Sequence, residues 1–516
     1  MRRATLSRTP PVLVLALLAG AAAIAQDVPS LAGFDRYVRQ AVEDWETPGL
    51  AISVVADGAV VFAEGYGAQR LGAEGQGAGV DEHTLFAIGS TTKAMTAALV
   101  GMLVDEGKLA WGDPVIDHLP GFRLYDPVAT REVQARDLLT HNAGLPNADY
   151  LWYEQDLSTD EIVRRLRFVE PAYSLRSGFI YQNIMYAAAG ELIEAVSGQS
   201  WGEMVRTRIF EPLGMSRSVT SLADTGGRSN VAHPHDLVDG RLMEIENASV
   251  DPVAAAGAVW SSVHDMAQWM RFLLAGGVTP EGRRLLSEET IEALFRAHAI
   301  VGPEDFYPTA RLTEPHWTTY GLGWFQADYR GRRVDFHTGS IDGMVALCGL
   351  IRDEGLGVYV LANRDHTELR HALMYRVFDL LDPARARGGD ATGEIRDWST
   401  ELRDLYAELA AEGEEARREA RERRVEGTQP TLPLERYTGR YQDPLYGVVE
   451  IGLGEDGGLR VGYGRRAGSV QHWNYDTFRV RWDARWRGES SLSFDLDRNG
   501  EVARLTLDGL RLARDR

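Results

Sequence analysis

A charged segment divides the chain into two parts with different sequence patterns. Residues 385–433 are rich in Arg and Glu over most of their length. Four apolar residues recur there at helical spacing, namely Trp398, Leu402, Leu405 and Leu409. They predict an amphipathic helix, and the charges beyond Glu412 predict a solvated helical linker. Because 516 residues exceed the size of a single core, we expect one domain on each side.

The part before the linker, residues 26–384, mixes strand and helix patterns. Asp57-Gly58 between two β-branched runs predicts a hairpin over residues 50–66, and residues 90–106 predict a long apolar helix. Successive antiparallel strands are expected over 322–328, 333–337, 345–351 and 357–362. Strands at both ends of a domain predict an α/β (α+β) fold, in which one antiparallel sheet is flanked by helices and a helical cluster.

The part after the linker, residues 434–516, changes to short strands separated by turns. Strands are expected over 447–451, 459–463, 478–482, 491–496 and 502–507. So many short strands in about 80 residues predict a small β-barrel or sandwich.

The first 25 residues have the pattern of a secretory signal peptide. Three arginines precede an apolar run over residues 12–22, and the Ala-Ile-Ala sequence at 23–25 has the small-x-small form of a cleavage site. The run is short for a membrane span, although an uncleaved anchor is the alternative. We expect cleavage before Gln26 and a periplasmic or secreted protein without a stable membrane span.

Composition excludes some partners and singles out one residue. The net charge of −20 argues against nucleic-acid binding. Among 55 basic residues only Lys93 and Lys108 are lysines. Arg keeps its proton at any working pH, whereas a desolvated Lys can lose it, so a retained lysine is a candidate chemical group. Lys108 ends a charged stretch and is expected to be exposed, but Lys93 follows Ser90 by three residues.

The first motif is Ser90-Thr91-Thr92-Lys93 at the start of the apolar helix. Residues three apart share a helix face, so the lysine amine can reach the serine hydroxyl. A serine becomes a good nucleophile when a neighbouring base takes its proton. A helix cap with a surface lysine is the alternative, but the apolar residues that follow favour a buried helix.

Two further motifs are weak when taken singly. In the second motif, Tyr181 can shuttle a proton when it lies near a lysine. The Asn183 amide can bind a substrate carbonyl or hold the lysine in place. In the third motif, His337-Thr338-Gly339-Ser340 ends an expected strand. Gly339 would let a substrate lie close to that strand. The backbone N–H of Ser340 could form an oxyanion hole together with the backbone N–H of Ser90. A histidine that only ends the strand is the alternative.

Taken in order, the three motifs resemble those of the serine β-lactamase and penicillin-binding-protein family. The similarity is greatest to the branch that contains class C β-lactamases, DD-carboxypeptidases, D-aminopeptidases and related esterases. Flanking stretches over about residues 30–380 resemble it too, including residues 138–146 and 320–324. Residues 437–441 begin a region that is similar to the lipocalin-like C-terminal domain of these hydrolases.

The resemblance implies a role for each motif residue and requires no cofactor. Ser90 would be acylated, Lys93 and Tyr181 would share the general base and acid roles, and Asn183 would hold the substrate amide. The remaining expected roles are substrate binding by His337, Thr338 and Gly339, and an oxyanion hole from the backbone N–H groups of Ser90 and Ser340. The expected substrate is a small molecule or peptide, with peptidoglycan-derived peptides among the candidates.

One departure from the family pattern affects the expected substrate. β-Lactamases usually carry Lys-Thr-Gly in the third motif, whereas His337 makes the charge at this place depend on pH. We therefore expect hydrolysis of peptides, amides or esters. A class C-like β-lactamase and a non-catalytic protein that binds cell-wall material or a partner are the alternatives. No metal site is expected, since His233 and His235 lack a third ligand, and Cys348 is expected to be a buried apolar residue.

Overall fold

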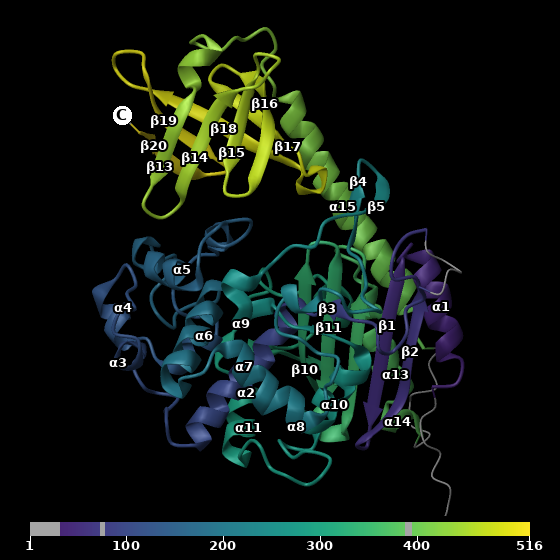
Figure 1. Ribbon diagram of the computed structural model, residues 1–516. Helices are drawn as coiled ribbons and strands as arrows, with labels where there is room; N and C mark the ends of the chain where they lie inside the picture. The colour runs from purple at the N-terminus through teal and green to yellow at the C-terminus, as the bar shows by residue number, and fades with distance from the viewer. Residues whose placement is uncertain (1–30, 73–77, 387–394, 516) are drawn as a thin grey trace, which may run out of the picture.

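The computed structural model describes residues 31–72, 78–386 and 395–515, so the expected signal peptide lies outside the described residues. Figure 1 shows a large α/β domain and a separate β-barrel, with helix α15 (Trp398–Glu422) running from one to the other. Within the described part of the chain, no helix is both long enough and apolar enough to span a bilayer.

The α/β domain contains one eight-stranded antiparallel sheet, which confirms the expected class of fold. Its strand order is β2-β1-β12-β11-β10-β9-β8-β7. The strands are β1 (Gly49–Ala56), β2 (Ala59–Gly67), β7 (Ala299–Ile300), β8 (Thr318–Tyr320), β9 (Phe325–Tyr329), β10 (Arg332–Ile341), β11 (Met344–Ile351) and β12 (Leu356–Ala362). Strands β1 and β12 are buried over almost their whole length and pair next to each other near the β2 edge of the sheet, which joins the two ends of the domain in sequence.

Helices cover both faces of this sheet and create two hydrophobic clusters. One face carries α1 (Phe34–Asp44), α13 (Leu369–Leu380) and the first half of α15. The other face carries α10 (Val263–Leu274) and the buried helices α2 (Thr92–Asp105) and α6 (Ile184–Ser197).

Shorter helices, one pair of strands distant in sequence and one small hairpin surround these elements. The helices are α3 (Val115–His118), α4 (Pro127–Glu132), α5 (Thr159–Arg165), α7 (Trp201–Val205), α8 (Glu211–Leu213), α9 (Ala254–Gly257), α11 (Glu288–Phe295), α12 (Ala310–Thr313) and α14 (Pro383–Ala386). Strand β3 (Phe86–Ala87) pairs with β6 (Trp260–Ser261), and β4 (His235–Val238) pairs with β5 (Arg241–Glu244).

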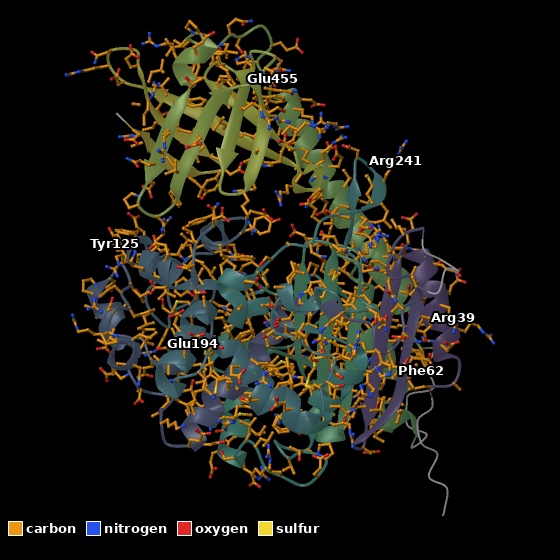
Figure 2. All side chains as sticks on the ribbon, viewed as in Figure 1. Arg39, Phe62, Tyr125, Glu194, Arg241 and Glu455 are labelled. Atoms are coloured by element: carbon orange, nitrogen blue, oxygen red, sulfur yellow. The ribbon has the colours of Figure 1, made fainter. Side chains whose placement is uncertain are left out.

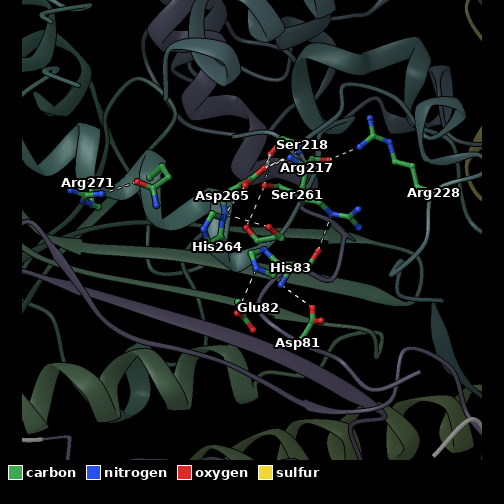
Figure 3. Close-up of polar contacts among 12 residues, drawn as sticks. Asp81, Glu82, His83, Arg217, Ser218, Arg228, Ser261, His264, Asp265 and Arg271 are labelled. Carbon is green, nitrogen blue, oxygen red and sulfur yellow. Dashed lines mark hydrogen bonds and ion pairs between the residues drawn. The ribbon is translucent and has the colours of Figure 1, made fainter. Parts of the chain in front are cut away.

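A buried carboxylate ties the β3–β6 pair to helix α10. The Asp265 Oδ2 atom accepts hydrogen bonds from the backbone N–H groups of Arg217 and Ser218 and from the Ser218 hydroxyl, all within 2.9 Å. The Ser218 hydroxyl in turn lies 2.8 Å from that of Ser261 on β6 (Figure 3). This network helps to fix the strand that precedes the first motif.

Helix α15 belongs to two environments. Trp398 and Leu402 are fully buried against the sheet-facing helices, and the Trp398 indole donates to Asp379 on α13 at 2.8 Å. Beyond Leu409 the helix is exposed and carries Glu–Arg pairs along its surface. Residues 398–409 of the expected linker therefore pack on the α/β domain, because their apolar stripe completes the second hydrophobic cluster.

The C-terminal domain is a closed eight-stranded antiparallel barrel. Its strands are β13 (Gly439–Asp443), β14 (Gly447–Leu453), β15 (Leu459–Tyr463), β16 (Arg466–Asn474), β17 (Thr477–Trp482), β18 (Glu489–Leu496), β19 (Val502–Leu507) and β20 (Leu510–Arg514). Alternate residues of these strands point inward and form their own hydrophobic cluster. Charged side chains cover the outer surface of both domains, where Arg39, Glu194 and Glu455 point away from the ribbon (Figure 2).

The barrel packs directly on the α/β domain. Leu445, in the turn between β13 and β14, is 7% exposed and joins the hydrophobic cluster of the α/β domain. The Arg165 guanidinium donates to the Leu445 carbonyl at 3.0 Å. Tyr150 and Tyr446 pack edge to face with ring centroids 4.9 Å apart. These contacts place the barrel beside the segment that follows residue 148.

Candidate active site

Ser90 lies in a 3-10 turn, Gly89–Thr91, immediately before helix α2. The expected helix over 90–106 therefore begins two residues later than predicted, at Thr92, and Ser90 does not cap it. Its hydroxyl is instead free to contact Lys93, which is on the first turn of the helix. The helix is buried over Thr92–Leu103, as its apolar sequence predicts.

Lys93 is fully buried and contacts the Ser90 hydroxyl. Its Nζ atom lies 2.9 Å from Ser90 Oγ, 2.7 Å from Asn183 Oδ1 and 2.9 Å from the carbonyl oxygen of Ala256. Burial lowers the pKa of Lys93 to about 7, although the negative charge of Asp149 opposes this shift. A large fraction of this lysine is therefore a neutral amine near neutral pH.

Tyr181 and Asn183 precede helix α6 and meet the first motif there. The Lys93 Nζ atom lies 4.9 Å from the centroid of the Tyr181 ring. The Tyr181 hydroxyl oxygen is buried, and no described residue meets the geometric criteria of a hydrogen bond to it. Burial raises the pKa of Tyr181 well above 10, and the adjacent Ser90 hydroxyl offsets a part of this rise. The tyrosine is thus protonated and able to donate a proton inside the cavity.

His337 is buried on strand β10 and is neutral. Its Nδ1 atom lies 2.5 Å from the Thr338 carbonyl oxygen and its Nε2 atom lies 3.0 Å from the Tyr320 hydroxyl. Since a carbonyl only accepts, Nδ1 carries the proton and Nε2 accepts from the tyrosine. Burial and the nearby charge of Lys93 lower the pKa of His337 to about 3. A pKa this low would place the expected change of charge at His337 well below neutral pH.

Glycines let strand β10 approach the nucleophile turn. A Cβ atom at Gly339 would lie 1.9 Å from the carbonyl oxygen of Ile88 and 2.9 Å from the Ser90 nitrogen. A Cβ atom at Gly89, where φ is +51°, would lie 2.7 Å from the Ser340 nitrogen. This close approach brings together the two segments that carry the backbone N–H groups of Ser90 and Ser340, the groups expected to form the oxyanion hole.

The motif residues line one cavity of about 410 Å³. Its walls include Ser90, Tyr181, Asn183, His337, Thr338 and Ser340. Further lining residues that the motifs do not contain are Glu304, Asp305 and Tyr307, and the Tyr307 hydroxyl lies 2.6 Å from Thr338 Oγ1. Among the described residues that line this cavity, none carries a positive charge at neutral pH.

Two residues that belong to none of the three motifs contact the motif residues directly. Asp149 accepts a hydrogen bond from Asn183 Nδ2 at 3.0 Å. The Arg370 guanidinium supports strand β10 from behind by donating to the Gly339 carbonyl at 2.7 Å and to Ser340 Oγ at 3.0 Å. Aspartate and arginine are frequent in this chain, so only their contacts distinguish these two residues.

The remaining residues singled out in the sequence lie outside this cavity. His233 contacts Glu244 at 3.0 Å and His235 contacts the Asn363 carbonyl at 2.9 Å. Throughout the described ranges, no three His, Cys, Asp or Glu side chains are grouped to hold a metal ion. Cys348 is a free, buried thiol, and Lys108 is exposed and pairs with Glu106.

Comparison with known proteins identifies the families to which the two domains are similar. The family model described as Beta-lactamase matches residues 34–381, and the model described as Domain of unknown function (DUF3471) matches residues 423–515. Unguisins hydrolase ungD of Aspergillus violaceofuscus (strain CBS 115571) is 32% identical over 449 residues, which cover 81% of this chain and 76% of that protein. Penicillin-binding protein 4 of Amycolatopsis lactamdurans is 29% identical over 328 residues, covering 61% of this chain and 81% of its own length.

Solved structures share the fold. The octameric penicillin-binding protein homologue from Pyrococcus abyssi superimposes with a TM-score of 0.60 at 22% identity and covers 94% of this chain and 100% of its own. The D-stereospecific amidohydrolase from Streptomyces sp. has a TM-score of 0.53 at 23% identity over 65% of this chain and 95% of its own. The chain therefore belongs to the beta-lactamase and penicillin-binding-protein family of serine hydrolases and carries an eight-stranded C-terminal barrel of the DUF3471 type.

Proposed function

We propose that this protein is an exported hydrolase that cleaves peptide, amide or ester bonds through an acyl-enzyme on Ser90. The observation that carries the proposal is the 2.9 Å contact between Ser90 Oγ and a fully buried Lys93, whose pKa is lowered to about 7. A neutral amine at this distance can take the serine proton as the hydroxyl attacks. Export is inferred from the signal-peptide pattern of the first 25 residues.

The proposed reaction has two halves. Ser90 Oγ bonds to the substrate carbonyl carbon while its proton moves to Lys93 Nζ, and the backbone N–H groups of Ser90 and Ser340 hold the oxyanion. The carbon–nitrogen or carbon–oxygen bond then breaks as the leaving group takes a proton from Lys93 through Tyr181. Water, deprotonated by the same base, attacks the ester, and Ser90 recovers its proton as the acid product leaves.

The electrostatics of the cavity favour substrates without a carboxylate near the third motif. His337 is neutral, and the charge of Arg370 is compensated behind strand β10 by Glu368 at 2.8 Å. Glu304 and Asp305 add negative charge to the cavity wall. Among the described residues that line this cavity, none offers a cation to an anionic β-lactam or a C-terminal carboxylate, which would lose hydration there without gaining an ion pair. A neutral or amine-bearing substrate avoids this loss. We therefore rank amides, esters and peptides with a free amine above β-lactams.

Labelling and turnover test the proposal in sequence. A fluorophosphonate probe should modify the purified protein at Ser90, and Ser90→Ala should abolish the label. The ranking is tested by comparing D-alanine p-nitroanilide, p-nitrophenyl acetate, a D-alanyl-D-alanine peptide and nitrocefin, with kcat/KM expected to be highest for the first two. An adduct elsewhere contradicts the serine chemistry, and faster nitrocefin turnover contradicts the ranking.

A further inference from the structure

Asn183 connects Lys93 to Asp149, a residue outside the three motifs. Its Oδ1 atom accepts from Lys93 Nζ at 2.7 Å, and its Nδ2 atom donates to Asp149 Oδ1 at 3.0 Å. An amide has an acceptor on one side and donors on the other. Because a carboxylate only accepts, Asp149 requires the Nδ2 group on its own side and leaves Oδ1 facing Lys93.

This orientation determines where the lysine lone pair points. A neutral primary amine has two N–H groups and one lone pair. Asn183 Oδ1 and the Ala256 carbonyl can only accept, so they take both N–H groups at 2.7 and 2.9 Å. The lone pair remains for the hydroxyl of Ser90 at 2.9 Å. A reversed amide would donate to Lys93 and withdraw the lone pair from the serine.

Asp149 is itself held firmly in place. Its Oδ1 atom also accepts from the Trp152 indole at 2.7 Å, and its Oδ2 atom accepts from Asn147 Nδ2 at 3.2 Å. The backbone N–H groups of Trp152 and Tyr153 donate to the Asp149 carbonyl at 3.1 and 2.8 Å. The carboxylate therefore has little freedom to turn away from the amide.

The barrel holds the chain that immediately follows this carboxylate. Tyr446 packs on Tyr150, and the Arg465 backbone N–H donates to the Glu154 carbonyl at 2.8 Å. Arg487 forms a 2.6 Å ion pair with Glu154 in which the two side chains are only 14% and 11% exposed. Such a shielded pair resists screening by solvent more than a surface pair does.

We propose that Asp149 is a positioning residue that orients the Asn183 amide and thereby directs the lone pair of Lys93 at the nucleophile. The barrel, in turn, fixes the segment that carries Asp149. The inference rests on the proposed serine chemistry. It assigns the C-terminal domain a part in catalysis that requires no contact with substrate.

The charge of Asp149 supports the same assignment, because it raises the pKa of Lys93 against the effect of burial. The other titratable groups that face this lysine are His141, His337, Tyr181 and Tyr186. Burial lowers the pKa of both histidines and raises the pKa of both tyrosines, so all four are uncharged near neutral pH.

Two substitutions separate orientation from charge. Asp149→Asn keeps an acceptor oxygen but removes the charge, whereas Asp149→Leu removes both at similar size. The rate of fluorophosphonate labelling of Ser90 is measured against pH in each. Without the charge, the pKa of Lys93 falls, so Asp149→Asn should reach its full rate at lower pH than wild type, with a plateau within about threefold. Asp149→Leu should lower the plateau about 100-fold or more, as loss of general-base catalysis does.

The outcomes distinguish this inference from the proposed function. Labelling of wild type at Ser90, combined with pH profiles and plateaus equal to wild type in both Asp149 variants, overturns the positioning role alone. Absence of labelling in wild type overturns the serine chemistry instead. Circular dichroism verifies that each variant is folded.

A matched pair of glycines tests the barrel. Gly464 and Gly500 are both in barrel turns with positive φ, +57° and +77°. A Cβ atom at Gly464 would lie 2.3 Å from the Glu154 carbonyl oxygen, whereas one at Gly500 would meet nothing within 4 Å. Gly464→Ala should slow labelling about tenfold through displacement of the segment, whereas Gly500→Ala should not.

A second pair of variants tests the barrel in case Gly464→Ala does not fold. Arg487→Gln removes the ion pair with Glu154 and should also slow labelling, whereas Arg460→Gln, in the exposed barrel pair with Asp483, should not. Equal labelling rates in both test variants and both controls overturn the role of the barrel.

Discussion

Arg370 and Glu368 form a buried ion pair directly behind the strand that carries the third motif. The guanidinium donates from Nη2 to Oε1 at 2.8 Å and from Nε to Oε2 at 3.1 Å, and the side chains are 5% and 8% exposed. Burial alone would raise the pKa of Glu368, but Arg370 and His371 together hold it well below its usual value of 4.5. The pair thus remains charged on both sides, and Arg370 can hold the Gly339 carbonyl in place.

Removal of one partner should destabilise the protein. Glu368→Gln leaves the Arg370 charge buried without compensation, and we expect the free energy of unfolding to fall by about 3 kcal/mol. Urea unfolding followed by tryptophan fluorescence measures the change. Glu501→Gln, which removes an exposed partner of Arg436, is the control and should leave the midpoint nearly unchanged. Equal midpoints for both variants would contradict a structural role for the pair.

The activity of wild type should rise with pH through the pKa of Lys93. Only the neutral amine accepts the serine proton, and its pKa is lowered to about 7. We therefore expect kcat/KM for p-nitrophenyl acetate to increase about tenfold per pH unit below 7 and to level off above it. Lys93→Met should lower the plateau about 1000-fold or more, because the nucleophile loses its base. A profile that is flat between pH 5 and 8 would exclude Lys93 as the titrating base.

His337 should remain neutral over the same range. Its pKa of about 3 and its contact with the Thr338 carbonyl predict the Nδ1-protonated tautomer from pH 5 to 8. Nuclear magnetic resonance of ¹⁵N-labelled histidine, assigned with His337→Gln, measures both properties directly. A titration of the His337 signals between pH 5 and 7 would show that the position carries a switchable charge after all.

Tyr181→Phe should lower kcat more than it changes KM. In the described part of the chain no group forms a hydrogen bond with this buried hydroxyl, so its removal leaves no unsatisfied group behind. We expect kcat to fall about 100-fold, as loss of a proton shuttle does, with thermal stability unchanged or slightly higher. Steady-state kinetics with p-nitrophenyl acetate and a thermal melt test both parts. A raised KM at constant kcat would mean that Tyr181 binds substrate and does not move protons.

The sequence by itself determined the fold class and indicated which residues form the three motifs. Apolar strands, the Asp57-Gly58 turn and the short C-terminal strands are local patterns, and strand and turn propensities act over a few residues. The scarcity of lysine also singled out Lys93 without any structure, because an exposed positive charge could be provided by Arg alone.

Only the tertiary structure decided the electrostatics and the support of the site. The charge state of His337 depends on its burial beside Lys93, and the orientation of Asn183 depends on Asp149, 34 residues earlier in the chain. The contact between the barrel and the segment after Asp149 joins residues about 300 positions apart. Burial and contacts between distant segments arise only when the chain is folded, so no local pattern could have predicted them.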